Sequence, residues 1–311
     1  MRIRPPIRTS ADEHACEEYA EVYNTNEFRT DRRPRVPENA NGHSMIRQPA
    51  VAGSFYPDGS GALSDALEGM TFPAADLTAR GIVVPHAGYV YSGHIAGEVY
   101  SHVRLPRRHI MLCPNHTGRG RPLAIMSEGA WETPLGQAQI DTSLAEILHD
   151  LHPELDDDAE AHRFEHGLEV QIPFLQFLIG SKFQFVPITI GTTEPDRLTG
   201  LGHALSRAVS ESGDDILIVA SSDMNHYESD HNTRIKDRMA IDRILARDPE
   251  GLHRTVFSED ISMCGVAPTV AMLTAVNDLG ANRAELIRYG TSGDIFGDRE
   301  RVVGYAGIVI S

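Results

Sequence analysis

The sequence predicts an α/β sandwich with a mixed or mainly parallel central sheet flanked by helices. Short apolar runs typical of buried strands alternate with longer segments whose apolar residues recur at helical spacing. Turn residues follow the apolar runs, and hydrophobic residues make up 41% of the 311 residues, which is enough for a core. No internal repeat or low-complexity linker interrupts this alternation after residue 45.

The N-terminal segment, residues 1–44, differs from the rest of the chain. It is rich in Arg, Glu, Asp, Pro and Asn, has few aliphatic residues and shows no sustained period. Such a segment cannot bury enough apolar surface to offset the entropy lost on folding. We therefore expect a disordered tail followed by a single domain over residues 45–311. Met45 could be an alternative start, or the tail could be a short regulatory segment.

Six segments are predicted to be strands, and six are predicted to be helices. The strands are residues 81–84, 109–113, 183–190, 216–220, 284–289 and 302–310. The helices are residues 92–103, 141–151, 165–178, 194–212, 230–247 and 267–279. Asp141 or Thr142 is a suitable N-cap for the second helix, and the last helix is so apolar on one side that we expect it to be buried.

Charge and cysteine content exclude several classes of partner. The net charge is −16, from 44 acidic and 28 basic residues, and such a surface repels nucleic acids and anionic membranes. Three cysteines are an odd, sparse set that does not suggest a disulfide framework, so a reducing compartment is the simpler interpretation. The chain opens with no apolar signal segment, and its longest apolar runs are too short to cross a bilayer. We expect a cytoplasmic protein.

Three predicted strands lead directly into a histidine. His86 follows residues 81–84, His116 follows residues 109–113, and His226 follows residues 216–220. Ligands of such folds bind at the carboxyl ends of the strands, so neighbouring strands would bring the three imidazoles together. Neutral imidazole is the commonest protein ligand for metals. A single strand-end histidine is more often a hydrogen-bonded loop residue, but its repetition favours a metal site.

Cys264 lies just before the predicted buried helix. A thiolate at a helix N-terminus is favoured by the helix dipole and would be a soft ligand for iron, copper or zinc. The alternative is a small buried hydrophobic residue, which is the interpretation we give Cys113 inside its strand. Cys16 lies in the predicted tail and is given no role.

Two further polar clusters could support such a site. Glu165, His166 and Glu169 are predicted to open a helix, where they could orient imidazole N–H groups or simply form a cap and a solvated acidic turn. Ser292 and Asp294 lie in a glycine-bounded turn after a strand, which could line the pocket, cradle an anion or be only a tight turn. A serine-hydrolase elbow, a dinucleotide fingerprint and paired C-x-x-C motifs do not occur.

These motifs together resemble the Memo family, called AmmeMemoRadiSam system protein B in prokaryotes. The similarity extends from about Met45 to the C-terminus and keeps the family's order. It rests on PAVAGSFYP (49–57), PHAGYVYSG (85–93), PNH (114–116), EHGLEVQ (165–171), SSDMNHY (221–227) and YGTSGD (289–294).

The resemblance implies a three-layer sandwich like that of the catalytic subunits of class III extradiol dioxygenases. It implies that His86 and His116 bind Fe(II), or else copper or zinc, and that Cys264 stands where those dioxygenases place a carboxylate. His226 would then be the acid/base, and Asp223 would orient it or add a ligand. Tyr89, Asn115, Glu165, His166, Ser292 and Asp294 would bind substrate or support the ligands.

Three functions follow as hypotheses. The first is a mononuclear iron or copper oxidoreductase acting on an unidentified small molecule. The second is a non-catalytic protein that binds a metal or an anionic peptide on the same scaffold. The third is a zinc hydrolase, since two histidines, a cysteine and a water suit zinc. The prokaryotic family name also implies a functional link to a radical-SAM protein.

Overall fold

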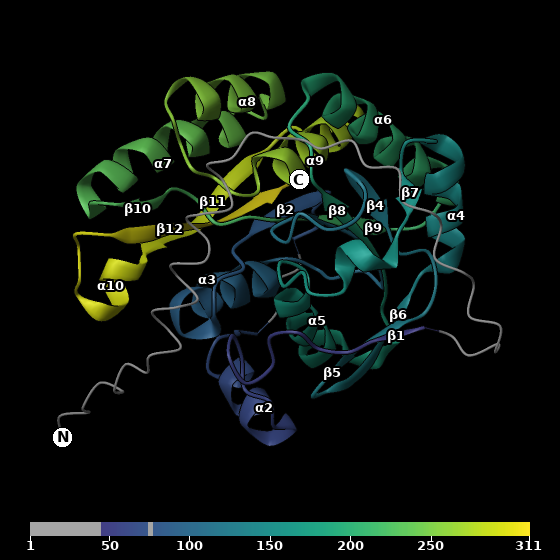
Figure 1. The fold of residues 1–311 in the computed structure, drawn as a ribbon, viewed down its shortest axis with the longest axis horizontal. Coiled ribbons are helices and arrows are strands. Elements are labelled where there is room, and N and C mark those ends of the chain that lie inside the picture. The colour runs from purple at the N-terminus through teal and green to yellow at the C-terminus, as the bar shows by residue number, and fades with distance from the viewer. Residues whose placement is uncertain (1–44, 74–76) are drawn as a thin grey trace. The chain divides into compact units, whose positions relative to one another are not determined.

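The computed structural model describes residues 45–73 and 77–311, and the predicted tail over residues 1–44 lies outside them. Within the described ranges, helices cover both faces of one mixed sheet (Figure 1). The predicted α/β sandwich is therefore confirmed. In the same ranges, no helix has the length and apolar character of a membrane span.

The sheet is parallel at its centre and antiparallel towards the end of the chain. Its strands are β1 (Ile46–Arg47), β2 (Gly81–Val84), β3 (Arg108–Pro114), β4 (Leu123–Ile125), β5 (Ala130–Thr133), β6 (Gly136–Ile140), β7 (Asp156–Asp157), β8 (Gln184–Ile190), β9 (Ile216–Ser221), β10 (His226–Glu228), β11 (Ala284–Thr291) and β12 (Val302–Ile310). Strands β8, β3, β9 and β2 are parallel neighbours in that order, and Ile110 of β3 pairs with Val186 of β8 and Ile218 of β9. Strand β12 runs antiparallel to β2 and to β11.

The helices form the two outer layers. They are α2 (Ser60–Glu68), α3 (Tyr89–His102), α4 (Thr142–Leu151), α5 (Ile172–Ile179), α6 (Pro195–Ser212), α7 (Asp230–Leu245), α8 (Pro249–Ser258), α9 (Val266–Asp278) and α10 (Ser292–Phe296), with short 3-10 turns at Ala159–His162, Glu169–Gln171 and Gly180–Lys182. Figure 1 shows α6, α8 and α9 on one side of the sheet and α2, α3 and α5 on the other.

A hydrophobic core lies on each face of the sheet, between the strands and the helices that cover that face. There are two cores because successive side chains along a strand point to opposite faces. On β3, Ile110 and Leu112 pack into the core that contains residues of α6 and α9. Met111 and Cys113 of the same strand point to the opposite core, which contains residues of α2, α3 and α5. The central strands are thus buried on both faces, as parallel strands in α/β proteins require.

Two local predictions are wrong. The helix predicted over residues 165–178 begins later, with the 3-10 turn Glu169–Gln171 followed by α5. Residues 165–168 instead form a turn in which the Gly167 N–H donates to the Glu165 carboxylate. The turn predicted around Ser292 is instead helix α10, closed by a capping box between Thr291 and Asp294. Helices α2 and α8 and the hairpin β5–β6 were not predicted.

Helices α6 and α9 approach closely at Gly202, and this contact gives a testable prediction. A Cβ at Gly202 would lie 2.5 Å from Thr274 Cβ and 2.7 Å from the Ala271 carbonyl oxygen. We expect Gly202→Ala to lower the free energy of unfolding by about 1–3 kcal/mol through overpacking. Urea denaturation would measure the change.

Gly200 in the same helix is the matched control. It is exposed, and a Cβ there would meet only His152 Nε2 at 3.7 Å. Gly200→Ala should therefore raise the free energy of unfolding by about 0.5–1 kcal/mol, from helix propensity alone. Equal effects of the two substitutions would contradict the packing argument.

Candidate metal centre

Three adjacent strands bring the candidate residues to one edge of the sheet. Strands β3, β9 and β2 are parallel neighbours, so their carboxyl ends leave the sheet on the same side. His86 follows the end of β2 by two residues and His116 follows the end of β3 by two residues. The segment that leads to His226 follows β9. The topology therefore provides the rim on which a shared site can form.

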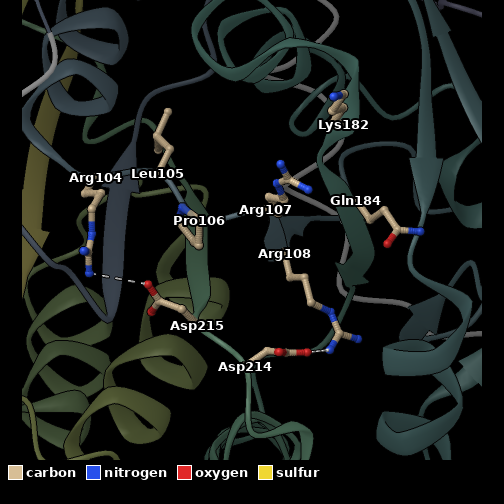
Figure 2. A pocket seen from close by; sticks show the side chains of 9 residues that line it. All are labelled: Arg104, Leu105, Pro106, Arg107, Arg108, Lys182, Gln184, Asp214 and Asp215. Carbon is tan, nitrogen blue, oxygen red and sulfur yellow. Dashed lines mark hydrogen bonds and ion pairs between the residues drawn. The ribbon is translucent and has the colours of Figure 1, made fainter.

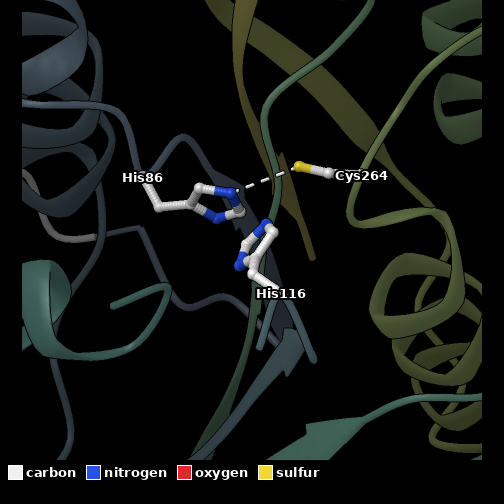
Figure 3. A group of neighbouring side chains, drawn as sticks. All are labelled: His86, His116 and Cys264. Atoms are coloured by element: carbon white, nitrogen blue, oxygen red, sulfur yellow. Dashed lines mark hydrogen bonds between the residues drawn. The ribbon is translucent and has the colours of Figure 1, made fainter. Parts of the chain in front are cut away.

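His86, His116 and Cys264 form a compact group on this rim. One donor atom from each, an imidazole nitrogen or the sulfur, lies within 4.8 Å of the others. The Cys264 sulfur lies 3.2 Å from His86 Nε2, and the two imidazole centroids are 5.0 Å apart with the rings nearly perpendicular. Figure 3 shows the two rings and the sulfur turned toward one another. Cys264 comes from the segment immediately before α9.

The His86 ring is oriented by a hydrogen bond at Nδ1, the ring nitrogen that points away from Cys264. Its Nδ1 lies 2.9 Å from Ser221 Oγ, whose own proton goes to the Gly167 carbonyl 2.6 Å away. Ser221 must then accept from His86, so Nδ1 carries the proton and the Nε2 lone pair faces Cys264. Burial, together with the neighbouring His116, lowers the pKa of His86 well below its usual value of 6.5. The ring is neutral and ready to donate its lone pair.

The His116 ring is held by a buried carboxylate. Glu165 Oε1 lies 2.7 Å from His116 Nδ1, and Glu165 Oε2 accepts the His116 backbone N–H at 2.7 Å. Burial alone would lower the pKa of His116 and raise that of Glu165. Their attraction instead moves the pKa of His116 to about 10 and that of Glu165 to about 2. A carboxylate on the far nitrogen is the usual support of a metal-binding histidine.

The donor set fits a transition metal. Desolvation raises the pKa of the Cys264 thiol, and the Asp223 backbone N–H lies 3.3 Å from the sulfur, where it can stabilise negative charge. Two imidazole nitrogens and one thiolate suit iron, copper or zinc, whereas magnesium and calcium prefer oxygen. Three protein ligands would also leave positions for water, substrate or another ligand.

His226 is close enough to interact electrostatically with His86 and His116, and it is oriented by Ser262. Its backbone N–H donates to Ser262 Oγ at 2.8 Å, and its Nδ1 lies 2.8 Å from the Ser262 carbonyl oxygen. Because a carbonyl only accepts, Nδ1 carries the proton and Nε2 is available as a base. Desolvation lowers the pKa of His226 to about 4. Asp223 acts elsewhere: its carboxylate accepts the His86 backbone N–H at 2.8 Å, and burial raises its pKa to about 7.

His166 adds a third imidazole to the ligand group. Its ring stacks on His116 with centroids 4.6 Å apart and meets the edge of His86 at 5.4 Å. His116, Glu165 and His166 also form a second group whose donor atoms lie within 4.8 Å of one another. Burial lowers the pKa of His166 to about 3, so this ring is neutral.

Tyr89 and Asn115 support the rim through the backbone. The Tyr89 hydroxyl donates to the Val170 carbonyl at 2.7 Å in the core below the site. The Asn115 amide donates to the Arg119 carbonyl at 2.6 Å, and its oxygen accepts from Thr117 Oγ1 at 3.0 Å. Both side chains therefore shape the loops that carry the candidate ligands.

Ser292 and Asp294 have partners within their own part of the fold. Ser292 Oγ accepts the Val303 backbone N–H at 3.0 Å. The Asp294 carboxylate is bound by the guanidinium groups of Arg234 at 2.7 Å and Arg299 at 3.1 Å. This ion-pair network fixes α10 against α7. The described contacts of both residues are structural.

A buried ion pair that the sequence analysis missed fixes the Glu165 turn. Arg47 Nη1 lies 2.7 Å from Glu169 Oε2, and Arg47 donates to the carbonyls of His162 and Glu165 at 2.7 Å each. Its guanidinium lies 4.1 Å from the centroid of the Trp131 ring. Glu169 also accepts from the Tyr56 hydroxyl and from the N–H groups of residues 50 and 51. The first described residues are thereby tied to the site.

Comparisons with known proteins identify the family that this chain resembles over most of its length. The model of the family described as "Memo-like protein" matches residues 47–309. A "MEMO1 family protein" of Methanococcoides burtonii is 42% identical over 269 residues, covering 85% of this chain and 100% of that protein. Proteins of the same description from Methanopyrus kandleri and Sulfolobus acidocaldarius are 40% and 41% identical, each over 85% of this chain and 99% of their own.

One solved structure shares the fold. A crystal structure of an uncharacterized protein from Escherichia coli K12 superposes with a TM-score of 0.52. The alignment covers 74% of this chain and 98% of that one, at 14% sequence identity. At this identity the likeness concerns the fold alone.

The Arg47–Glu169 pair gives a prediction about stability. Arg47→Met would leave the Glu169 carboxylate buried without its cation, and we expect a loss of about 3–5 kcal/mol in the free energy of unfolding. The double variant Arg47→Met/Glu169→Gln removes both charges and should lose clearly less. Urea denaturation of both variants would measure the difference.

The control is Arg238→Met, which breaks an ion pair with Asp242 in which both side chains are more than half exposed. It should change the free energy of unfolding by less than about 1 kcal/mol. A loss for Arg47→Met no larger than this would contradict the role given to the buried pair.

Proposed function

We propose that this chain, which belongs to the Memo family, binds one redox-active metal ion through His86, His116 and Cys264 and uses it in an oxidoreductase reaction on a small molecule. The observation that carries the proposal is the arrangement of the two imidazoles. Each is fixed through its far nitrogen, His86 by Ser221 and His116 by Glu165, with a thiol facing them. Such preorganisation is typical of a metal site.

Iron or copper is favoured over zinc. The thiolate is a soft donor, and the family resemblance is to enzymes that use non-haem Fe(II). A bound ion of this kind would supply Lewis acidity and one-electron chemistry. Zinc would supply only the former, and a zinc hydrolase therefore remains the third hypothesis.

The protein's own groups would position the substrate and move its proton. The Ser262 carbonyl holds the proton of His226 at Nδ1, so His226 Nε2 could take a proton from a substrate hydroxyl and later return it. The Glu165 carboxylate would stay hydrogen-bonded to His116 Nδ1 and would offset positive charge on that ring during the reaction. Asp223 would fix the backbone of His86 and, through its own N–H, the sulfur of Cys264.

A non-catalytic metal-binding protein is the second candidate. Cys264 is the observation that favours it, because the dioxygenases have a carboxylate where this chain has a more easily oxidised thiolate. The two candidates share the metal site and differ in turnover. Metal binding without oxygen consumption across a substrate screen would favour the second.

Metal content tests the ligand assignment. Protein purified without oxygen and without an affinity tag should contain one iron or copper ion per chain by ICP-MS. We expect His86→Ala, His116→Ala and Cys264→Ala to lose this ion, because each removes a donor atom. His226→Ala is the control and should keep the metal while losing any oxygen consumption. Stoichiometric metal in folded His86→Ala or His116→Ala would overturn the assignment.

The pH dependence of metal affinity follows from the pKa shifts. In the metal-free protein near pH 7, the raised pKa values keep His116 and Cys264 protonated, whereas His86 is already neutral. A metal must displace both protons, so its affinity should rise with pH, by up to about 100-fold per unit near neutrality. Calorimetry in buffers of different ionisation enthalpy would count the protons released.

Glu165→Gln provides the internal control for this prediction. It removes the carboxylate that raises the pKa of His116, so about one proton fewer should be released on metal binding at pH 7. Its metal affinity should also fall by about 10–100-fold, because the ring loses its support. A pH-independent affinity of the unaltered protein would contradict the protonation states given above.

A further inference from the structure

A pocket lies at the opposite ends of the strands from the candidate metal centre. It has a volume of about 550 Å³ and is lined by the first residues of β3 and β8 and by the segments before them and before β9. These residues are Arg104, Leu105, Pro106, Arg107, Arg108, Lys182, Gln184, Asp214 and Asp215 (Figure 2). Because His116 follows the far end of β3, the length of the strand separates the two sites.

The lining is basic although the chain as a whole is strongly acidic. Four basic and two acidic side chains face the pocket, while the full chain has 28 basic and 44 acidic residues. Lys182 is one of only two lysines in the sequence. The sequence alone did not show this cluster, because Lys182 joins the three arginines of residues 104–108 only when β8 pairs with β3.

Two of the four cations already have carboxylate partners. Arg108 is held by Asp141 through two hydrogen bonds, of 2.5 and 2.9 Å, and by Asp214. Arg104 lies 3.8 Å from Asp215, with both side chains about half exposed, which is a weak pair. Arg108 is thus a rigid wall of the pocket, and Arg104 also donates to Thr78 Oγ1 at 3.1 Å.

The other two cations have no carboxylate partner in the described part of the chain. No ion pair is formed there by Arg107 or Lys182. Figure 2 shows both among the side chains that line the pocket. The segments that carry them are joined by the hydrogen bond from the Gln184 backbone N–H to the Arg107 carbonyl at 2.8 Å. Like charges gathered at one place repel each other, and an anion placed between them would relieve that repulsion.

We propose that this pocket binds a phosphate-bearing small molecule of about the size of a nucleotide. Phosphate groups carry up to two charges and several acceptor oxygens, which suits guanidinium groups and an ammonium better than a single carboxylate does. The volume is that of an ordinary small-molecule site and exceeds what inorganic phosphate needs. Leu105 and Pro106 offer an apolar wall, and the Gln184 amide could bind a ring or sugar. A nucleic acid is excluded by the surrounding negative charge.

Calorimetric titration of the full chain with pyrophosphate, ATP and adenosine tests the proposal. We expect one saturable site for pyrophosphate and for ATP, mutual competition between them, weakening at high salt and no binding of adenosine. Absence of saturable binding of either phosphate compound would overturn the proposal. Binding of adenosine as tight as that of ATP would overturn the recognition of phosphate.

Matched double variants locate the site. Arg107→Gln/Lys182→Gln should weaken ATP and pyrophosphate binding by roughly 100-fold, since a hydrogen bond to a charged group contributes about tenfold or more. Arg238→Gln/Lys236→Gln removes the same charge from α7 and should leave binding within about twofold. An equal loss in both variants would mean that only overall charge matters, and would overturn the assignment.

His86→Ala separates this inference from the proposed metal function. Binding of ATP and pyrophosphate should be unchanged in His86→Ala, because the two sites lie at opposite ends of the strands. Loss of phosphate binding in this variant would place the anion at the metal centre and would overturn the second site. The metal content of Arg107→Gln/Lys182→Gln should equal that of the unaltered protein.

Discussion

The site depends first on one buried carboxylate. Glu165 is fully enclosed, yet it remains ionised because it binds the ring and the backbone of His116 and the N–H of Gly167. A lone carboxylate in such a place would be neutral or would destabilise the fold. Its enclosure therefore requires His116 to stay within hydrogen-bond distance, and this constraint fixes one donor of the centre before any metal arrives.

The sheet supplies the rest of the geometry. Parallel strands β3, β9 and β2 share two hydrophobic cores and cannot shift without moving both. The loops after these strands therefore start from fixed points, and short hydrogen bonds through Ser221 and Ser262 complete the orientation of the histidines. Arg47 then fixes the Glu165 turn from outside, so the described N-terminal segment belongs to the architecture of the site.

Local patterns allowed the sequence to predict the alternating layers and the position of His86 and His116 at strand ends, because each follows a run of apolar residues and a turn visible in the chain itself. The position of Cys264 beside them was implied by the family resemblance and not by such a pattern. The Arg47–Glu169 pair could not be predicted in this way, because its members are 122 residues apart and meet only after folding. The prediction that a helix begins at Glu165 was wrong for a related reason. The hydrogen bond from the His116 backbone N–H to the Glu165 carboxylate comes from a distant segment and outweighs the local helical spacing.

The raised pKa of Cys264 affects how readily this thiol is oxidised. Oxidants attack the thiolate, and a thiol that holds its proton near neutral pH reacts slowly with peroxide. In the metal-free chain this thiol therefore reacts slowly with oxidants, and it becomes reactive in the state that has lost its proton. A cysteine with the ordinary pKa of about 8.5 would already be a few per cent thiolate near pH 7 and would react correspondingly faster.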